Sequence, residues 1–563
     1  MSTAFFERHR DTLEQALQAL EQRGYWSPYS ESPSPRIYGD GAAQAGRLAY
    51  EKRLERPFVF TPEQAGGDQL AGAEVSPYGF ALGIRYPRPD LDRLLPTMQL
   101  AAASWRNAGP QVWSGVALEI VARLNARSFE IAHAVQHTTG QAFMMAFQAG
   151  GPHAQDRALE AIACAWQQLR AIPASARWEK PQGKHAPLVM QKSWRIVPRG
   201  IGLVIGCCTF PTWNSYPGLF ANLATGNAVI VKPHPGAILP LAITVEVARE
   251  VIAEAGFNPD IVTLAAHDAA DTEMARTLAL RQEIGLIDFT GSSANGHWLE
   301  RHAHQAEVYT EKSGINQIII DSTDNLAGMA HNIALSLALY SGQMCTTPQN
   351  IYIPKEGIAT PEGRVGFEDV TQAIVRALAS LTVDAAKAVE LLGAIQNEAV
   401  LQRIDAARLI GQVLLESTAL VHPQFPHARI RTPLVVQTRR NEVIAQEYFG
   451  PVSFIIPVDD TATAIALAQR TASEHGALTL SGYSTDAAVR QVMQDAAADA
   501  GVALSMNLTG GVFVNQSAAF SDFHGTGANP AANCTLTDAA FVAKRFRVVQ
   551  TREPVPTLPR LTP

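Results

Sequence analysis

One cysteine, Cys345, stands where covalent chemistry is feasible, between the small and polar residues Ser341–Met344 and the apolar run Ile351–Pro354. A cysteine thiolate is a strong nucleophile and forms covalent intermediates. Most isolated cysteines, however, are small buried hydrophobic residues. Cys345 is therefore a candidate nucleophile only if the rest of the sequence supplies the groups that such chemistry needs.

The residues 288–292 have the types expected of a phosphate-binding turn. An apolar strand that ends in a glycine, Gly291, lets the backbone approach a phosphate closely, and the free N–H groups of the next helix attract its charge. Ser292 is a natural N-cap for a helix that runs through Trp298 and Leu299. The alternative is an ordinary connection between a strand and a helix.

The composition is that of an ordinary globular protein. The 563 residues are 47% hydrophobic and 17% charged, which predicts two or three domains with a large core. The net charge of −7 argues against nucleic acid as the main partner, because phosphate binding requires a basic face. The sequence has no apolar run long enough to span a membrane and no apolar secretory leader, so we expect a cytoplasmic protein.

The cysteines and histidines do not predict a metal site. Five cysteines without a Cys-x-x-Cys pair are typical of a reducing compartment and give no structural zinc signature. His297, His302 and His304 are close in sequence, but no cysteine or carboxylate at ligand spacing completes a set. The adjacent Cys207 and Cys208 are candidates for redox activity, although buried cysteines at a strand end are the more common arrangement.

The first 170 residues are expected to be mainly helical. Residues 4–22 have the apolar spacing of an amphipathic helix. Residues 26–46 are rich in Pro, Ser and Gly, which predicts an extended surface segment. Residues 91–169 contain good helix formers, with a break at Gly150–Pro152.

After residue 187 the pattern changes to alternating strands and helices. Two short strands, at 188–190 and 194–197, are expected to form a hairpin arm near 185–200. The next strands are apolar on both faces, which is typical of a parallel sheet covered by helices. They are predicted at 201–205, 228–231, 261–265 and 285–289. A second α/β section begins near Gly314.

The segment Gly342–Cys345, Gly-Gln-Met-Cys, resembles the nucleophile motif of the aldehyde dehydrogenase superfamily. Glu311, in Tyr309–Gly314, matches the superfamily glutamate that activates water, at the separation from the cysteine that the superfamily pattern requires. A lone glutamate is usually a solvated surface residue. In this register, the resemblance implies that Cys345 forms a thioester and that Glu311 is the general base for its hydrolysis.

Two segments resemble the superfamily motifs that bind the adenosine half of the cofactor. The turn with Gly291 and Ser292 resembles the one that carries the pyrophosphate. Gly226–Pro233 resembles the strand whose lysine binds the adenosine ribose. This resemblance places Lys232 and Pro233 in the cofactor site. An exposed lysine at a strand end is the alternative for this second segment.

Gln446–Pro451 resembles the motif for the other half of the cofactor. It implies that Glu447 holds the nicotinamide ribose and that Phe449 packs beside the cofactor; an exposed turn is the alternative. Members that prefer NAD often have a glutamate after the strand lysine, where this chain has Pro233–Pro235. Without that carboxylate a 2′-phosphate is not repelled, so we expect NADP or NAD.

The resemblance implies an α/β protein with the aldehyde dehydrogenase fold, which combines a parallel-sheet cofactor domain, an α/β catalytic domain and a small β oligomerisation arm. We expect an N-terminal helical extension and the cofactor domain in 1–312, and the catalytic domain in 313–503. Residues 504–563 are expected to return to the cofactor domain and to supply oligomerisation strands and a tail. A homodimer or homotetramer is implied.

The chain departs from the superfamily pattern at the oxyanion site. The usual asparagine is replaced by Thr209, whose hydroxyl can donate one hydrogen bond. We assign the oxyanion to Thr209 and the Cys345 N–H, with Asn214 as the alternative donor if the local helix directs it inward. Thr209 and the His-Pro pair after the lysine resemble CoA-acylating members, which typically lack the glutamate that Glu311 supplies.

Residues 208–217 and 342–350, with the N-terminal extension, are similar to the PaaN branch of aldehyde dehydrogenases. This resemblance implies oxidation of a CoA-linked, ring-opened semialdehyde to an acid in aerobic phenylacetate degradation. The first alternative is a CoA-acylating enzyme, in which CoA replaces water. The second is a non-catalytic homologue that binds the cofactor without forming a thioester.

Overall fold

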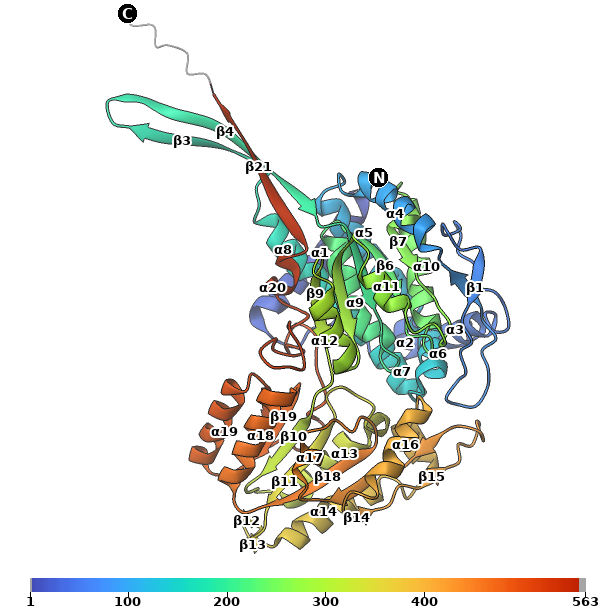
Figure 1. The fold of residues 1–563 in the computed structure, drawn as a ribbon, viewed down its shortest axis with the longest axis vertical. Coiled ribbons are helices and arrows are strands. Elements are labelled where there is room, and N and C mark those ends of the chain that lie inside the picture. Colours follow the sequence, from blue (N-terminus) through green and yellow to red (C-terminus); the bar gives the residue numbers. More distant parts are fainter. Residues whose placement is uncertain (1–2, 556–563) are drawn as a thin grey trace, which may run out of the picture.

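The computed structural model describes residues 3–555. The chain forms two α/β bodies that lie one above the other, and a narrow β arm projects from the upper body (Figure 1). The upper body contains the N-terminal helices and a five-stranded sheet, and the lower body contains a seven-stranded sheet. The C-terminal segment returns from the lower body to the upper one and ends in the arm. No helix in the described range 3–555 is long and apolar enough to cross a membrane.

The N-terminal region is largely helical, and the helix predicted at 4–22 is confirmed. Leu13 and Leu17 of this helix are buried, where it packs on α5 and α8. The prediction of an extended segment at 26–46 is partly wrong, because Ser34 caps a short helix that begins with a proline and the alanine-rich stretch after Gly41 forms another. The helices are α1 (Ala4–Gln22), α2 (Pro35–Tyr38), α3 (Ala42–Glu51), α4 (Leu91–Trp105), α5 (Pro110–Ala126), α6 (Ser128–Thr139), α7 (Phe143–Gly150) and α8 (Pro152–Arg170). The small strands β1 (Gln69–Ala71) and β2 (Tyr86–Arg88) pair between α3 and α4.

The upper sheet is parallel throughout, with the order β7-β6-β5-β8-β9. The parallel sheet predicted from the apolar strands is therefore confirmed, and Ser292 caps the helix that follows β8, as expected. The elements are β5 (Ile201–Ile205), α9 (Pro211–Ala224), β6 (Ala228–Lys232), α10 (Leu239–Glu254), η1 (Pro259–Ile261), β7 (Val262–Leu264), α11 (Met274–Ala279), β8 (Ile284–Thr290), α12 (Ser293–His302) and β9 (Glu307–Glu311).

The lower sheet has the order β14-β17-β18-β11-β10-β19-β20, and only its edge strand β14 is antiparallel to its neighbour. Along β10, Ile318 and Ile320 join one hydrophobic cluster and Ile319 joins another, so the sheet is buried on both faces. The strands are β10 (Asn316–Ile320), β11 (Pro348–Pro354), β14 (Gln412–Leu415), β17 (Leu434–Gln437), β18 (Val452–Val458), β19 (Thr479–Tyr483) and β20 (Ala503–Met506). The helices are α13 (Leu326–Ala338), η2 (Leu339–Gly342), α14 (Phe367–Ser380), α15 (Ala385–Leu392), α16 (Glu398–Ala407), α17 (Asn441–Ile444), α18 (Thr461–His475) and α19 (Ala487–Asp499). Two short strand pairs, β12 (Ile358–Thr360) with β13 (Gly363–Val365) and β15 (Ala419–Leu420) with β16 (Ile430–Arg431), lie outside the sheet.

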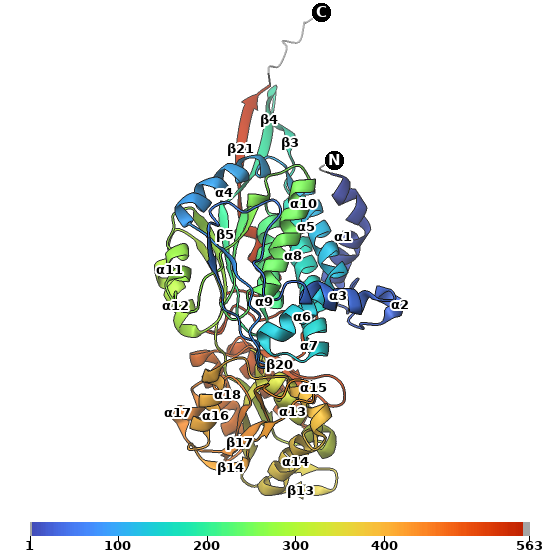
Figure 2. The ribbon, with the colours of Figure 1, turned by 90° about the vertical axis from the view of Figure 1, so that its right-hand side faces the viewer.

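The arm is a three-stranded antiparallel sheet with the order β21-β4-β3 (Figure 2). The prediction of two short strands at 188–190 and 194–197 is wrong, because β4 (His185–Pro198) is one continuous strand. Its hairpin partner is β3 (Ser175–Gln182), and β21 (Phe546–Pro554) pairs on its other edge, just after α20 (Ala539–Ala543). Its residues are mostly exposed in the single chain.

Candidate active site

Cys345 lies on a sharply bent segment between η2 and β11. Tyr340, Ser341 and Gly342 all have positive φ, at 50°, 51° and 64°. A side chain at Gly342 would place its Cβ 2.5 Å from the carbonyl oxygen of Gly450, so the glycine is required both for its φ and for this contact. The Asn316 side-chain amide on β10 donates to the Cys345 carbonyl at 2.7 Å. The cysteine is thereby fixed at the end of the lower sheet that faces the upper body.

Glu311 is the last residue of β9 and reaches Cys345 from the upper body. Its side chain is 1% exposed. The Asn214 side-chain amide donates to Glu311 Oε2 at 3.0 Å, and His524 Nε2 lies 3.1 Å from Oε1. Burial raises the pKa of Glu311, but the charge of His524 and hydrogen bonds from His524, Cys345 and Asn214 outweigh burial and hold it below its ordinary value.

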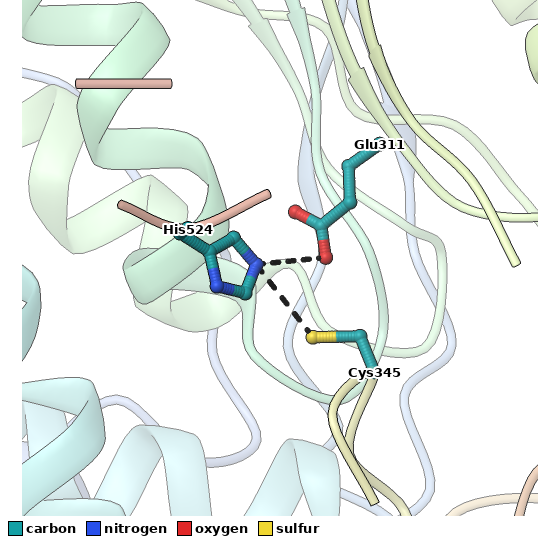
Figure 3. Close-up of side chains that lie close together, drawn as sticks. All are labelled: Glu311, Cys345 and His524. Carbon is teal, nitrogen blue, oxygen red and sulfur yellow. Dashed lines mark hydrogen bonds and ion pairs between the residues drawn. The ribbon is translucent and has the colours of Figure 1, made fainter. Parts of the chain in front are cut away.

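The third member of the site, His524, is a residue that the sequence analysis missed. Its Nε2 lies between the two others, 3.8 Å from Cys345 Sγ and 3.1 Å from Glu311 Oε1 (Figure 3). The imidazole is buried and packs edge-on against Trp213, with ring centroids 4.6 Å apart. The three ligand-type atoms lie within 4.8 Å of one another, a spacing that also suits a metal ion and that no sequence pattern indicated.

The segment that carries His524 is fixed by a buried ion pair on α8. Arg157 and Glu160 are paired at 3.0 Å and are almost fully buried. Arg157 donates to the Ser517 hydroxyl at 2.6 Å, and Glu160 accepts from the Phe520 N–H at 3.0 Å. Because these bonds hold the backbone just before His524, the irregular segment presents its imidazole in one place.

The surroundings of Cys345 oppose ionisation of its thiol. Burial raises the thiol pKa well above its ordinary value, and the charge of Glu311 raises it further. A nucleophilic thiolate therefore needs a neighbouring group that takes its proton. Of the described side chains, His524 places a nitrogen in hydrogen-bonding contact with the sulfur.

The structure distinguishes the two candidate oxyanion donors by position. Asn214, in the first turn of α9, lines the same cavity as Cys345 and binds Glu311. Thr209 is buried, its carbonyl accepts from Gln141 at 2.7 Å, and it is not among the residues that line this cavity. Thr209 remains a predicted oxyanion donor, and the position of Asn214 favours the alternative.

We expect Asn214→Ala to slow turnover more than Thr209→Ala. Removing one oxyanion donor usually costs about 10²–10³ in kcat. A loss of this size in Asn214→Ala, with a change below about tenfold in Thr209→Ala, is the expected pattern in steady-state kinetics with an aldehyde. The opposite pattern would restore Thr209 to the role that the sequence predicted.

The predicted adenosine-side residues lie at one edge of the upper sheet. Lys232 ends β6, and Gly291 and Ser292 follow β8, on either side of β5. Burial lowers the pKa of the Lys232 amine to about 8, and the charge of Asp271 partly offsets this effect. A buried amine, a glycine turn and the start of α12 are suited to the ribose and phosphates of a dinucleotide. Pro233 directly follows the lysine.

Glu447 and Phe449 lie on the other side of the site. Both line a small cavity with Gly342 and Met344, next to the cysteine. Glu447 accepts a hydrogen bond from the Gly314 N–H at 3.3 Å, and burial raises its carboxyl pKa. These residues are suited to the nicotinamide end of the cofactor, because a carboxylate beside a backbone turn can accept bonds from ribose hydroxyls.

The aldehyde dehydrogenase family profile matches residues 85–501, which is most of the chain. A crystal structure titled NAD-dependent aldehyde dehydrogenase, from Burkholderia multivorans, is 63% identical, with a TM-score of 0.97 over 99% of this chain and 100% of that one. The chain belongs to the aldehyde dehydrogenase family. The expected aldehyde dehydrogenase fold is confirmed, and both the N-terminal helices before residue 85 and His524 lie outside the matched range.

More distant proteins match the chain in fold or over part of its sequence. A Thermus 1-pyrroline-5-carboxylate dehydrogenase with bound NAD has a TM-score of 0.73 and 20% identity over 94% of this chain and 99% of that one. An N-succinylglutamate 5-semialdehyde dehydrogenase of Vibrio cholerae is 28% identical over 49% of this chain. The matched part spans about half (55%) of that relative's length. The same-named protein of Burkholderia multivorans is 27% identical over 68% of this chain and 74% of the relative. None of these names refers to phenylacetate degradation.

Proposed function

We propose that the protein is an NAD(P)-dependent aldehyde dehydrogenase that oxidises an aldehyde to a carboxylic acid through a thioester on Cys345. The observation that carries this proposal is the cluster of Cys345, His524 and Glu311, which supplies a nucleophile, a proton acceptor and a base for water. When bound, NAD or NADP accepts the two electrons and the hydrogen that leave the aldehyde carbon.

The first half of the proposed reaction is formation of a covalent bond between Cys345 and the aldehyde. In its neutral form, His524 takes the thiol proton at Nε2. The charge of the Glu311 carboxylate, with Oε1 3.1 Å from Nε2, stabilises the imidazolium that forms. The thiolate attacks the carbonyl carbon, and the Cys345 N–H and the Asn214 or Thr209 side chain donate hydrogen bonds to the oxyanion. Oxidation of this adduct leaves the acyl group on sulfur as a thioester.

The second half is hydrolysis of the thioester. Glu311 takes a proton from water, and the hydroxide attacks the thioester carbon. The carbon–sulfur bond breaks, the acid leaves and the Cys345 sulfur regains a proton from His524. Glu311 then releases the proton it took from water to the solvent. The low pKa of Glu311 keeps its carboxylate ionised and able to act as this base. Lys232, Ser292 and Glu447 are proposed to hold the ribose and phosphate groups of the cofactor.

We expect His524→Gln to slow alkylation of Cys345 by iodoacetamide near neutral pH and to shift its pH profile upward. Burial and Glu311 raise the thiol pKa, and the glutamine side chain cannot take the proton. General acid–base partners are typically worth about 10²–10⁴ in rate, so kcat should fall within this range. An unshifted alkylation profile would contradict the role of His524, whereas a merely structural role predicts loss of fold without a pH shift.

For the substrate, we propose a CoA-linked, ring-opened semialdehyde of aerobic phenylacetate degradation. This rests on the similarity of residues 208–217 and 342–350 to the PaaN branch. The test of this substrate is the rate of NADPH or NADH formation with this semialdehyde, compared with simple aldehydes. Equal rates would argue against the assigned substrate.

The exposed arm of β3, β4 and β21 supports a homodimer or homotetramer, because its edges and faces are free to pair with a second chain.

A further inference from the structure

A cavity of about 380 Å³ leads to Cys345, which is within the size range of small-molecule sites. One wall consists of the N-terminal extension, in the segment 25–31, which lies outside the matched family profile. Trp26 is packed edge-on against Phe520 with ring centroids 5.2 Å apart. The other walls are residues of α7, α8, the start of α9, the segment 339–346 around the cysteine and the segment 511–524.

The lining is largely apolar and aromatic. Phenylalanine, tryptophan, tyrosine and methionine side chains come from five separate parts of the chain. Such a surface binds the carbon skeleton of a ligand by burying it, while the reacting group lies at the end of the cavity that contains Cys345. These residues are Tyr25, Trp26, Tyr29, Met145, Phe210, Trp213, Met344 and Phe513.

The charged groups of the cavity are acids and histidines. No lysine or arginine is among the described residues that line it. Glu31 is paired with His153 at 2.8 Å, and Asp156 accepts a hydrogen bond from Ser27 at 2.9 Å. The nearby Arg157 lies against the Trp213 ring, and its guanidinium is already engaged by Glu160 and Ser517. The described residues that line the cavity therefore offer no lysine or arginine to a substrate carboxylate.

The pKa of the buried acid Asp156 indicates that the cavity wall disfavours negative charge. Burial raises the pKa of its carboxyl well above the ordinary value. A substrate carboxylate that enters this largely apolar lining loses hydration and finds no lysine or arginine there to pair with. Glu31 and Asp156 add repulsion when they are ionised.

We infer that the cavity selects aldehydes with an uncharged, apolar body and rejects aldehydes that carry a free carboxylate beside the chain. The inference rests on the proposed aldehyde oxidation and narrows its substrate class. A thioester-linked semialdehyde meets this requirement, because the end of its acyl chain is a neutral thioester. The corresponding free acid has an anionic carboxylate at the same position. The N-succinylglutamate semialdehyde in the names of the relatives carries free carboxylates, and this cavity is poorly suited to it.

The test compares 5-oxopentanoate with its methyl ester, two aldehydes that differ in charge and by one methyl group. We expect catalytic efficiency to be about 100-fold higher or more with the ester, since a buried site that leaves a polar group unpaired discriminates at this level. Equal rates, or a preference for the free acid, would overturn the inference.

A variant pair locates the effect in the cavity. Met145→Lys places a cation on the cavity wall, and we expect it to raise the catalytic efficiency with the free acid, relative to the ester, by about tenfold or more. Met144→Lys is the matched control, because Met144 is the adjacent residue and is 43% exposed outside the lining. An equal effect of both substitutions would contradict a role for the cavity wall.

The proposed function and the selectivity fail in different ways. If neither of these aldehydes nor the CoA-linked semialdehyde reduces NAD or NADP, the proposed dehydrogenase activity is wrong. Selectivity is then measured by protection of the Cys345 thiol from iodoacetamide, which requires only that the aldehyde occupies the cavity. Stronger protection by the ester would support the inference, and stronger protection by the acid would overturn it.

Discussion

Cys345→Ala is expected to abolish aldehyde-dependent reduction of NAD or NADP. Without the sulfur no covalent adduct forms, and the hydrogen on the aldehyde carbon is not activated for transfer. Removal of the nucleophile from an enzyme that forms a covalent intermediate costs on the order of 10⁶ in kcat. The measurement is cofactor reduction at saturating aldehyde, followed by absorbance.

Cys534→Ala is the matched control for loss of a thiol. Cys534 is also a free, partly exposed cysteine, but it packs against the upper core and does not line the cavity. We expect this variant to keep its turnover, and both variants to keep their affinity for NAD or NADP. Residual turnover within about tenfold of wild type in Cys345→Ala would contradict the covalent mechanism.

Glu311→Gln is expected to trap the enzyme as a thioester. The glutamine keeps a carbonyl oxygen that can accept the hydrogen bond from Asn214, but it cannot take a proton from water. We expect a burst of reduced cofactor close to one equivalent per active site, followed by turnover about 10²–10⁴-fold slower than in wild type. Intact-mass spectrometry should detect the acyl group on Cys345.

Glu307→Gln tests whether any charge change on β9 has the same effect. Glu307 lies on the same strand and pairs with Arg199 at 3.0 Å, away from the cysteine. We expect this variant to turn over at nearly the wild-type rate without an accumulated thioester. If Glu311→Gln released acid as fast as wild type, another group would have to activate the water.

The sequence predicted those features that depend on local residue patterns. Cys345 and Glu311 were found because each lies in a short motif, and the apolar strands around Ile230 and Ile287 predicted the parallel upper sheet. The folded chain brings Cys345 and Glu311 into one cluster because β9 of the upper body and the bend before β11 of the lower body meet there.

The sequence could not predict contacts made by irregular segments. His524 lies far from Cys345 in the chain, in a segment without periodicity, and its place depends on the bonds of Arg157 and Glu160 to residues 517–520. The choice between Asn214 and Thr209 depended on which way the first turn of α9 faces. The sequence likewise could not predict that residues 25–31 form a wall of the cavity, because an extended surface segment has no pattern that indicates what it covers.

The arm shows a different limit of sequence patterns. The short runs 188–190 and 194–197 predict two separate strands, but β4 continues through Gln191 and Lys192 because it is paired on both edges by β3 and β21. One partner comes from the C-terminal end of the chain, so the strand's length is a tertiary effect.

Product identity, measured with and without free CoA, tests the central claim most directly. The wild-type enzyme would receive a neutral semialdehyde and NAD or NADP, and the products would be separated by chromatography and identified by mass. The covalent mechanism with Glu311 as the base predicts free acid in the absence of CoA, and loss of that acid in Glu311→Gln. Acyl-CoA formed only when CoA is present, at a rate unchanged by Glu311→Gln, would contradict it and assign the chain to CoA-acylating chemistry.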